Sequence, residues 1–362
     1  MRTRGDFLRE LGLYGPGTER GKFSLKAANE YCCRMAKSHY ENFSVMGILL
    51  PRRFRSAFYS VYAYCRWADD LGDELRDTAL ALELLDWWEN ELYRAEYWGR
   101  TGLNSSDVMP EKLPFSHPVF VAMSDLFRRF SVPVEPFADL LQAFRSDCGG
   151  SLTELGSRSG RDTDNEGFRS GIYNSTLVEK LQCYLRSVGI KNNRSNLVND
   201  GKSNLLPIHY QTFDELEEYC RYSANPVGRI LLYLVSGNPS EEQLHWSDCI
   251  CTALQWANFW QDVSIDAQNN RCYIPVEIQE KYDSFTDVMR ELVARTRKKF
   301  DQGRPLIKSL PKNLRLCFSL FLRGGGATLD AIEKIGYKTD QKRPTVSKAK
   351  KIQLFLQSLL MK

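Results

Sequence analysis

The chain has 362 residues, of which 43% are hydrophobic and 12% aromatic, and its formal net charge is only +4. This composition is typical of a globular protein, and the length fits one large domain or two smaller ones. The small charge argues against nucleic acid as a partner, although a local basic patch could still face anionic lipid or a phosphorylated substrate.

Ten cysteines are present, but their placement does not indicate a disulfide framework. Cys32 and Cys33 are adjacent, Cys249 and Cys251 are two residues apart, and the others are scattered through mostly apolar segments. There is no Cys-x-x-Cys pair and there are only four histidines, which argues against a zinc site. Reduced thiols, together with the lack of a signal peptide or a long apolar run, predict a cytoplasmic protein.

Apolar residues recur at spacings of three and four along most of the chain, which predicts an all-α fold. The pattern predicts helices over residues 25–39, 54–75, 79–97, 116–130, 137–147, 212–234, 241–265, 283–300, 311–335 and 345–361. Trp87 and Trp88 are expected in the core. The glycine run at 323–326 is interpreted as a helix break, because it lacks the preceding strand and the following Lys-Ser/Thr of a phosphate loop.

Residues 148–208 are rich in Gly, Ser, Asn and charge, which predicts a loop-rich insert with one short helix near 174–188. Asn174 begins a glycosylation triplet, a pattern that is common by chance. The segment 347–362, SKAKKIQLFLQSLLMK, predicts a basic amphipathic helix. Such a helix either packs on the core or lies on the inner face of a membrane as a peripheral contact.

Acidic residues directly follow aromatic ones in YCRWADDLGDE, residues 64–74. In a helix, Asp69 and Asp73 share one face because they are four residues apart, and Tyr62 and Arg66 lie on the same stripe. Asp70 and Glu74 form a second pair that is rotated away from the first.

A second polar stripe occurs in QWANFWQDVSID, residues 255–266. It combines two carboxylates with two amides and runs along a helix otherwise rich in Trp and Phe; its members are Gln255, Asn258, Asp262 and Asp266. A solvated acidic face rarely carries so many aromatic neighbours, which predicts that this stripe meets a polar group inside the fold.

Carboxylate and amide oxygens without His or Cys favour magnesium, which binds one or two carboxylates and takes substrate phosphates for other positions. Two such stripes on facing helices could hold a diphosphate through metal ions, with Arg66 and Arg271 binding the same group. The alternative is that each Asp-x-x-x-Asp pair is an exposed helical face. The aromatic and arginine neighbours of both pairs favour the functional interpretation.

These motifs resemble those of the squalene/phytoene synthase family of head-to-head isoprenoid synthases. Residues 254–275, LQWANFWQDVSIDAQNNRCYIP, are similar to the family's Q-x-x-N-x-x-x-D-V-x-x-D…R-x-Y-x-P signature, and residues 219–231, YCRYSANPVGRIL, resemble its Tyr-Cys…Val-Gly helix. The resemblance covers about 20–147 and 209–361. It implies one domain over 1–362, interrupted by the insert, and a helical bundle around a central cavity.

Three further stretches resemble the hydroxysqualene synthase branch of bacterial hopanoid-type pathways: SHYENF at 38–43, NFWQDV at 258–263 and IGYKTDQKRPTVSKAKK at 335–351. Two departures from the wider family fit this branch. Gln261 stands where many members have Arg, and Tyr40-Glu41-Asn42 replaces a common Ser-x-Ser.

The resemblance implies roles for individual residues. The metal ligands would be Asp69, Asp73, Asn258, Asp262 and Asp266, which hold two or three Mg²⁺ ions. Diphosphate contacts would come from Arg66, Gln255 and Arg271, with His39 and Asn42 close by. Cavity tyrosines would be Tyr62, Tyr219 and Tyr273, and Gln261 or a tyrosine would position a water. His39 could equally be an ordinary helix-end residue and Tyr219 a core tyrosine.

The branch implies conversion of presqualene diphosphate and water to hydroxysqualene and diphosphate, without NADPH, alongside companion enzymes of squalene synthesis. One alternative is a squalene or phytoene-type synthase that condenses two farnesyl or geranylgeranyl diphosphates itself. Another is a non-catalytic helical binding protein, against which the retained aspartates, Arg66 and Asn258 argue.

Overall fold

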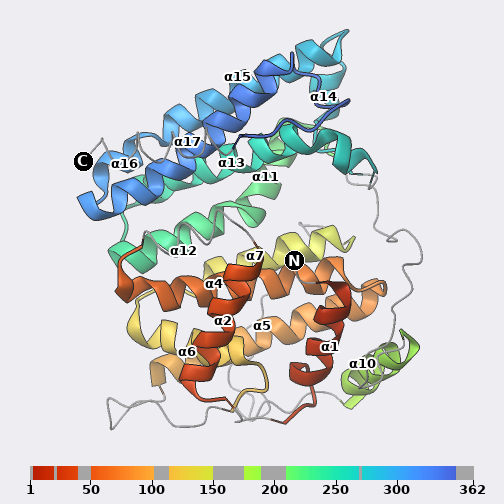
Figure 1. Ribbon diagram of the computed structural model, residues 1–362, viewed down its shortest axis with the longest axis vertical. Coiled ribbons are helices and arrows are strands. Elements are labelled where there is room, and N and C mark those ends of the chain that lie inside the picture. The colour runs from red at the N-terminus through yellow and green to blue at the C-terminus, as the bar shows by residue number, and fades with distance from the viewer. Residues whose placement is uncertain are drawn as a thin grey trace. The chain divides into compact units, whose positions relative to one another are not determined.

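The computed structural model describes residues 3–19, 23–39, 50–101, 114–149, 175–188, 209–268 and 271–347. These ranges contain helices and no strand, which confirms the all-α prediction (Figure 1). No helix in them is long and apolar enough to cross a membrane. All ten cysteines fall within these ranges, and none forms a disulfide.

The chain forms two compact units, one of residues 1–48 and 52–204 and the other of residues 49–51 and 205–362. The helices of the first unit are α1 (Arg4–Tyr14), α2 (Leu25–His39), α4 (Arg52–Asp73), α5 (Thr78–Thr101), α6 (Pro118–Arg129), α7 (Glu135–Asp147) and α10 (Ser175–Ser187). Those of the second are α11 (Phe213–Ser223), α12 (Asn225–Ser236), α13 (Glu241–Gln268), α14 (Val276–Gln279), α15 (Phe285–Gly303), α16 (Pro305–Ser309) and α17 (Lys312–Lys334).

Most predicted helices are present with ends shifted by a few residues, but two predictions are wrong. The helix expected over 212–234 is two helices, because the chain turns at Ala224 and Pro226 opens α12. The glycine run at 323–326 does not break α17, which continues through it. The short helix of the insert is present as α10. The remainder of the insert beyond 149, with Asn174, and the C-terminal segment after 347 lie outside the described residues.

Helix α1 was not predicted, although a local signal marks its start. Thr3 and Asp6 form a reciprocal capping box, in which each side chain accepts a hydrogen bond from the other residue's backbone N–H. The helix then buries Phe7, Leu8 and Leu11. These few apolar positions make a weak periodic pattern, which explains why it was overlooked.

The packing of the core of the first unit determines which face of α4 is buried and which face is turned away from the core. Trp67 stacks on Trp88 with ring centroids 5.8 Å apart, and the His117 ring meets Trp67 edge-on at 4.4 Å. Trp87 and Trp88 are both buried, as predicted. Because Trp67, Ala68 and Leu71 are buried, the residues on the other side of α4 are turned away from this core.

The second unit is built around α13, the longest of its helices (Figure 1). Trp260 donates a hydrogen bond from Nε1 to Thr296 Oγ1 of α15 at 2.8 Å, and Trp256 is buried against Phe213 with ring centroids 4.7 Å apart. Since these tryptophans anchor one side of α13, its polar stripe lies on another side.

Candidate functional site

The first aspartate stripe lies at the C-terminal end of α4, where Arg66 bridges two carboxylates. Its Nη1 lies 2.9 Å from Asp69 Oδ2, and its Nη2 forms an ion pair with Asp70 Oδ1. Asp70 is only 1% exposed, whereas Asp73 is exposed and the Asp69 side chain keeps 39% of its surface accessible. Asp69 and Asp73 are therefore the pair open to a ligand, and Asp70 is an internal counter-ion of Arg66.

The environment of this stripe raises the pKa values of Asp69 and Tyr62. Burial raises the pKa of Asp69 to about 7, and the Asp73 carboxylate one turn further adds to the shift, while Arg66 opposes it. Burial likewise raises the pKa of Tyr62 to about 12, so its phenol stays protonated at neutral pH. A metal ion beside Asp69 and Asp73 would offset the repulsion between the two carboxylates.

The second stripe lies on the C-terminal half of α13. Asn258 is exposed, and the side chains of Gln255, Asp262 and Asp266 are partly accessible. Burial raises the pKa of Asp266 to about 6, and Asp262 adds to the shift, whereas Arg271 and Arg343 oppose it. The backbone N–H of Arg271 donates to the Asp266 carbonyl at 2.9 Å, which brings the arginine back to the end of the helix.

A pocket of about 340 Å³ opens beside Asp266 and Arg271. Its aromatic wall contains Phe259 and Tyr273, whose rings are stacked with centroids 3.8 Å apart and planes 6° apart. Tyr219 is buried against both rings, with centroid distances of 6.3 Å to Phe259 and 6.2 Å to Tyr273. The structure thus brings a predicted carboxylate, a predicted arginine and two predicted tyrosines together in one unit.

Some members of this site were not predicted. His209 lines the same pocket, and Tyr210 joins the aromatic cluster at 5.7 Å from Tyr219. Arg343 forms an ion pair with Asp262, and Gln261 Nε2 donates to the Pro344 carbonyl at 2.8 Å. No spacing rule connects the residues at 209, 210, 343 and 344 to the predicted residues of α13, since they come from coil segments before α11 and after α17.

Two predicted residues cannot be placed in the site. Asn42 lies outside the described residues. His39 is the last residue of α2, and only its backbone is described. The predicted roles of both residues stay predictions.

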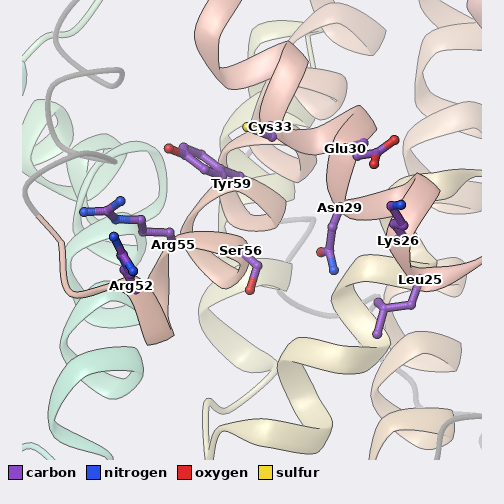
Figure 2. Close-up of a pocket in the computed structure, with 9 residues that line it drawn as sticks. All are labelled: Leu25, Lys26, Asn29, Glu30, Cys33, Arg52, Arg55, Ser56 and Tyr59. Atoms are coloured by element: carbon purple, nitrogen blue, oxygen red, sulfur yellow. The ribbon is translucent and has the colours of Figure 1, made fainter.

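A second pocket, of about 630 Å³, lies in the first unit between the N-terminal halves of α2 and α4 (Figure 2). Arg52 and Arg55 lie together on one side of it, and Lys26 and Glu30 lie on the other. None of the predicted site residues lines this pocket. Its mixed charges and the lack of a carboxylate pair make it a weaker candidate than the aspartate stripes.

Comparison with known families identifies the chain. The family model described as squalene/phytoene synthase matches residues 36–350, which include both aspartate stripes. The chain belongs to the squalene/phytoene synthase family. It is thus a squalene/phytoene-type isoprenoid synthase, as its motifs predicted.

Individual members of this family share moderate identity with the chain. A squalene synthase, HpnC, from Alicyclobacillus acidocaldarius is 31% identical, with a TM-score of 0.62, over 86% of this chain and 95% of that one. The 15-cis-phytoene synthase of Synechocystis sp. is 22% identical over 91% of this chain and 83% of the relative. Phytoene synthase 1 of Solanum lycopersicum is 23% identical, and the chain covers 66% of its length. A ligand-bound dehydrosqualene synthase, 20% identical with a TM-score of 0.65, shares the fold.

The family implies a divalent metal, and the residues present fit one in their chemistry. Among the residues that the structure describes, no three His, Cys, Asp or Glu side chains form a metal-binding group. Each stripe instead offers one carboxylate pair, and the two pairs belong to different units. Their ligand atoms are hard oxygens, which suit Mg²⁺. Arg66 Nε is buried without a hydrogen-bond partner among the described residues, so this donor remains available to an anion held there.

Proposed function

We propose that the chain is a hydroxysqualene synthase, which converts presqualene diphosphate and water to hydroxysqualene and diphosphate. The observation that carries this proposal is the set of branch-like stretches at 38–43, 258–263 and 335–351, and the 31% identity to the squalene synthase HpnC supports a squalene-type rather than a phytoene-type product. Gln261, which replaces the arginine of many family members, supports the same branch. The chain would then act between an enzyme that makes presqualene diphosphate and one that reduces the alcohol, in the cytoplasm or peripherally at the membrane.

The polar residues would bind the departing diphosphate. Mg²⁺ ions held by the aspartates of each stripe, with Asn258 on the second, would supply positive charge to the leaving group. Arg66 and Arg271 would each contact diphosphate oxygens, with Gln255 as a hydrogen-bonding amide. Fixed charges of this kind stabilise the negative charge as it develops, which lowers the barrier to ionisation.

The aromatic cluster would protect the allylic or cyclopropylcarbinyl cation that ionisation leaves behind. The buried faces of Tyr219, Phe259 and Tyr273 form an apolar wall next to Asp266 and Arg271. An aromatic face stabilises a desolvated cation by about 2 kcal/mol, and the wall excludes indiscriminate water.

One water must nevertheless reach the cation at a defined carbon, and we assign its positioning to Gln261 or to a tyrosine of the wall. The Gln261 amide is held in place by its hydrogen bond to the Pro344 carbonyl at 2.8 Å. Gln261→Arg should therefore shift products away from the alcohol, measured by mass spectrometry of the extract. An unchanged yield of hydroxysqualene from this variant would show that Gln261 does not position the water and would leave a tyrosine as the candidate.

The decisive experiment supplies purified protein with Mg²⁺ and presqualene diphosphate, without NADPH. Hydroxysqualene and released diphosphate are the expected products. The control is the variant Asp69→Asn/Asp262→Asn, which should bind metal poorly and form neither product. Absence of turnover by the folded wild-type protein would overturn the proposal.

A second candidate is a one-enzyme synthase that condenses two prenyl diphosphates, and the phytoene synthase relatives favour it. It predicts product from farnesyl or geranylgeranyl diphosphate alone, with NADPH added where the product is reduced. If no prenyl diphosphate is turned over, the remaining interpretation is a helical binding protein, which calorimetry with a non-hydrolysable prenyl diphosphate would detect.

A further inference from the structure

The segment that follows α17 folds back along the second aspartate stripe. Gly336 and Tyr337 adopt positive φ angles of 68° and 63°. The Tyr337 N–H donates to the Ile332 carbonyl at 3.0 Å and the Gly336 N–H to the Glu333 carbonyl at 2.9 Å, the pattern of a Schellman turn. The turn reverses the chain direction, and residues 342–347 then run without regular structure beside α13 (Figure 1, dark blue). We name residues 338–347 the return segment.

The return segment is anchored at defined points. Thr339 is 0% exposed, and Pro344 is also buried. The Pro344 carbonyl accepts the hydrogen bond from Gln261, the residue before Asp262. These anchors fix the position of the segment along α13, so the side chain that precedes Pro344 lies against the aspartate stripe.

That side chain is Arg343, and it occupies both oxygens of Asp262. Its Nε donates to Oδ1, and its Nη2 lies 3.2 Å from Oδ2, which is a bidentate pairing. The Asp262 side chain is 28% exposed and that of Arg343 is 42% exposed, so the pair can open without unfolding the core. Arg343 also lowers the pKa of Asp266, which shows that its charge reaches both carboxylates of the stripe.

We propose that Arg343 is a displaceable counter-ion of the second aspartate stripe, which competes with the divalent metal for Asp262. The inference rests on the metal-binding role of Asp262 in the proposed function. The bidentate guanidinium uses one lone pair on each oxygen and places a positive charge beside the carboxylate, so Mg²⁺ must approach Asp262 against the repulsion of Arg343, and the two cations compete for this carboxylate. In the metal-free protein Arg343 offsets the repulsion between Asp262 and Asp266, and it must leave Asp262 when the metal binds.

This proposal predicts opposite effects of removing Arg343 on metal binding and on stability. Arg343→Gln should bind metal more tightly, because no internal cation has to be displaced. It should also be less stable than wild type without metal, because the two carboxylates then repel each other. A purely structural role would lower stability without raising metal affinity.

The test measures Mn²⁺ binding to the full chain without substrate, from the electron paramagnetic resonance signal of free Mn²⁺. We expect Arg343→Gln to lower the dissociation constant about threefold, the size of one partly exposed ion pair. Arg297→Gln is the matched control, because Arg297 pairs with Asp330 and Glu333 elsewhere in the same unit. In an Asp262→Asn background, Arg343→Gln should change the affinity far less.

The outcomes separate this inference from the proposed function. An unchanged or weaker Mn²⁺ affinity in folded Arg343→Gln would overturn the competition while leaving the proposed reaction intact. No Mn²⁺ binding by either protein would overturn the metal assignment itself, and the competition with it. Tighter binding in Arg343→Gln supports the inference whatever substrate the enzyme proves to use.

Discussion

Phe259 and Tyr273 stack face to face with ring centroids 3.8 Å apart, one on α13 and the other in the coil that follows it. The stack packs the coil that carries Tyr273 against α13, the helix of the second aspartate stripe, and both rings line the pocket. It lies beside Asp266 and Arg271, so in the proposed function it would face the hydrocarbon end of the diphosphate ester. The pocket therefore joins a charged end and an apolar end within one unit.

Loss of the Tyr273 ring should impair the carbocation step. We expect Tyr273→Ala to lower turnover of the accepted prenyl diphosphate about tenfold, since one desolvated cation–π contact contributes about 1–2 kcal/mol. Tyr273→Phe keeps the stack and should stay within about twofold of wild type. Product formation under saturating substrate measures both variants. Equal losses in the two would show that the hydroxyl, rather than the ring, carries the effect.

Arg66 should stabilise the fold in addition to any role in diphosphate binding, because it neutralises the buried Asp70. Arg66→Gln removes a cation from beside that buried carboxylate, and we expect it to cost about 3 kcal/mol in free energy of unfolding. Urea denaturation gives this value. Arg9→Gln is the control, because Arg9 and Asp6 form an exposed pair whose loss should cost little.

The double variant Arg66→Gln/Asp70→Asn separates the two roles of Arg66. It should recover most of the lost stability while turnover remains low, because the buried charge is gone but the diphosphate contact is not restored. A double variant that regains turnover would show that Arg66 acts only through Asp70.

Sequence periodicity was enough to predict most of the long helices and the placement of Asp69 and Asp73 on one stripe, although it missed α1. It could not rank the three neighbouring aspartates of α4 by burial, because that depends on how Trp67 and Trp88 pack. It also missed Arg343, since an ion pair between residues 81 apart leaves no local pattern. The break at Ala224 was foreseeable from Pro226, because proline favours the first turn of a helix.

Metal-free stability should depend on pH through Asp69. Burial raises its folded-state pKa to about 7 from the ordinary value of 3.8, so the folded protein binds the proton more tightly than the unfolded chain. The stability that protonated Asp69 contributes to the folded state is fully present below pH 3.8 and is lost as the pH rises towards and through 7. Asp69→Asn lacks this loss, so the variant should gain stability relative to wild type as the pH rises.

The size of this effect is reduced by solvent screening, because the Asp69 side chain is 39% exposed. We expect the difference in unfolding free energy between Asp69→Asn and wild type to grow by about 1 kcal/mol between pH 5 and pH 8. Urea denaturation in EDTA measures it. A difference that is constant across this range would mean that Asp69 is charged at both pH values. Saturating Mg²⁺ should remove the advantage of the variant, because the metal stabilises the charged carboxylate.

The glycine run inside α17 offers a matched pair of substitutions. A Cβ on Gly325 would lie 2.3 Å from Phe300 Cζ and 2.9 Å from Leu254 Cδ2, whereas a Cβ on Gly326 would meet nothing within 4 Å. Gly325→Ala should therefore destabilise the second unit by about 1–3 kcal/mol through overpacking of α17 against α15 and α13. Gly326→Ala should stabilise it by about 0.5–1 kcal/mol, because alanine favours a helix interior over glycine. Thermal unfolding of both variants measures the contrast. Destabilisation by both would mean that this part of α17 needs glycine for flexibility, whereas opposite signs would establish that Gly325 is required by close packing alone.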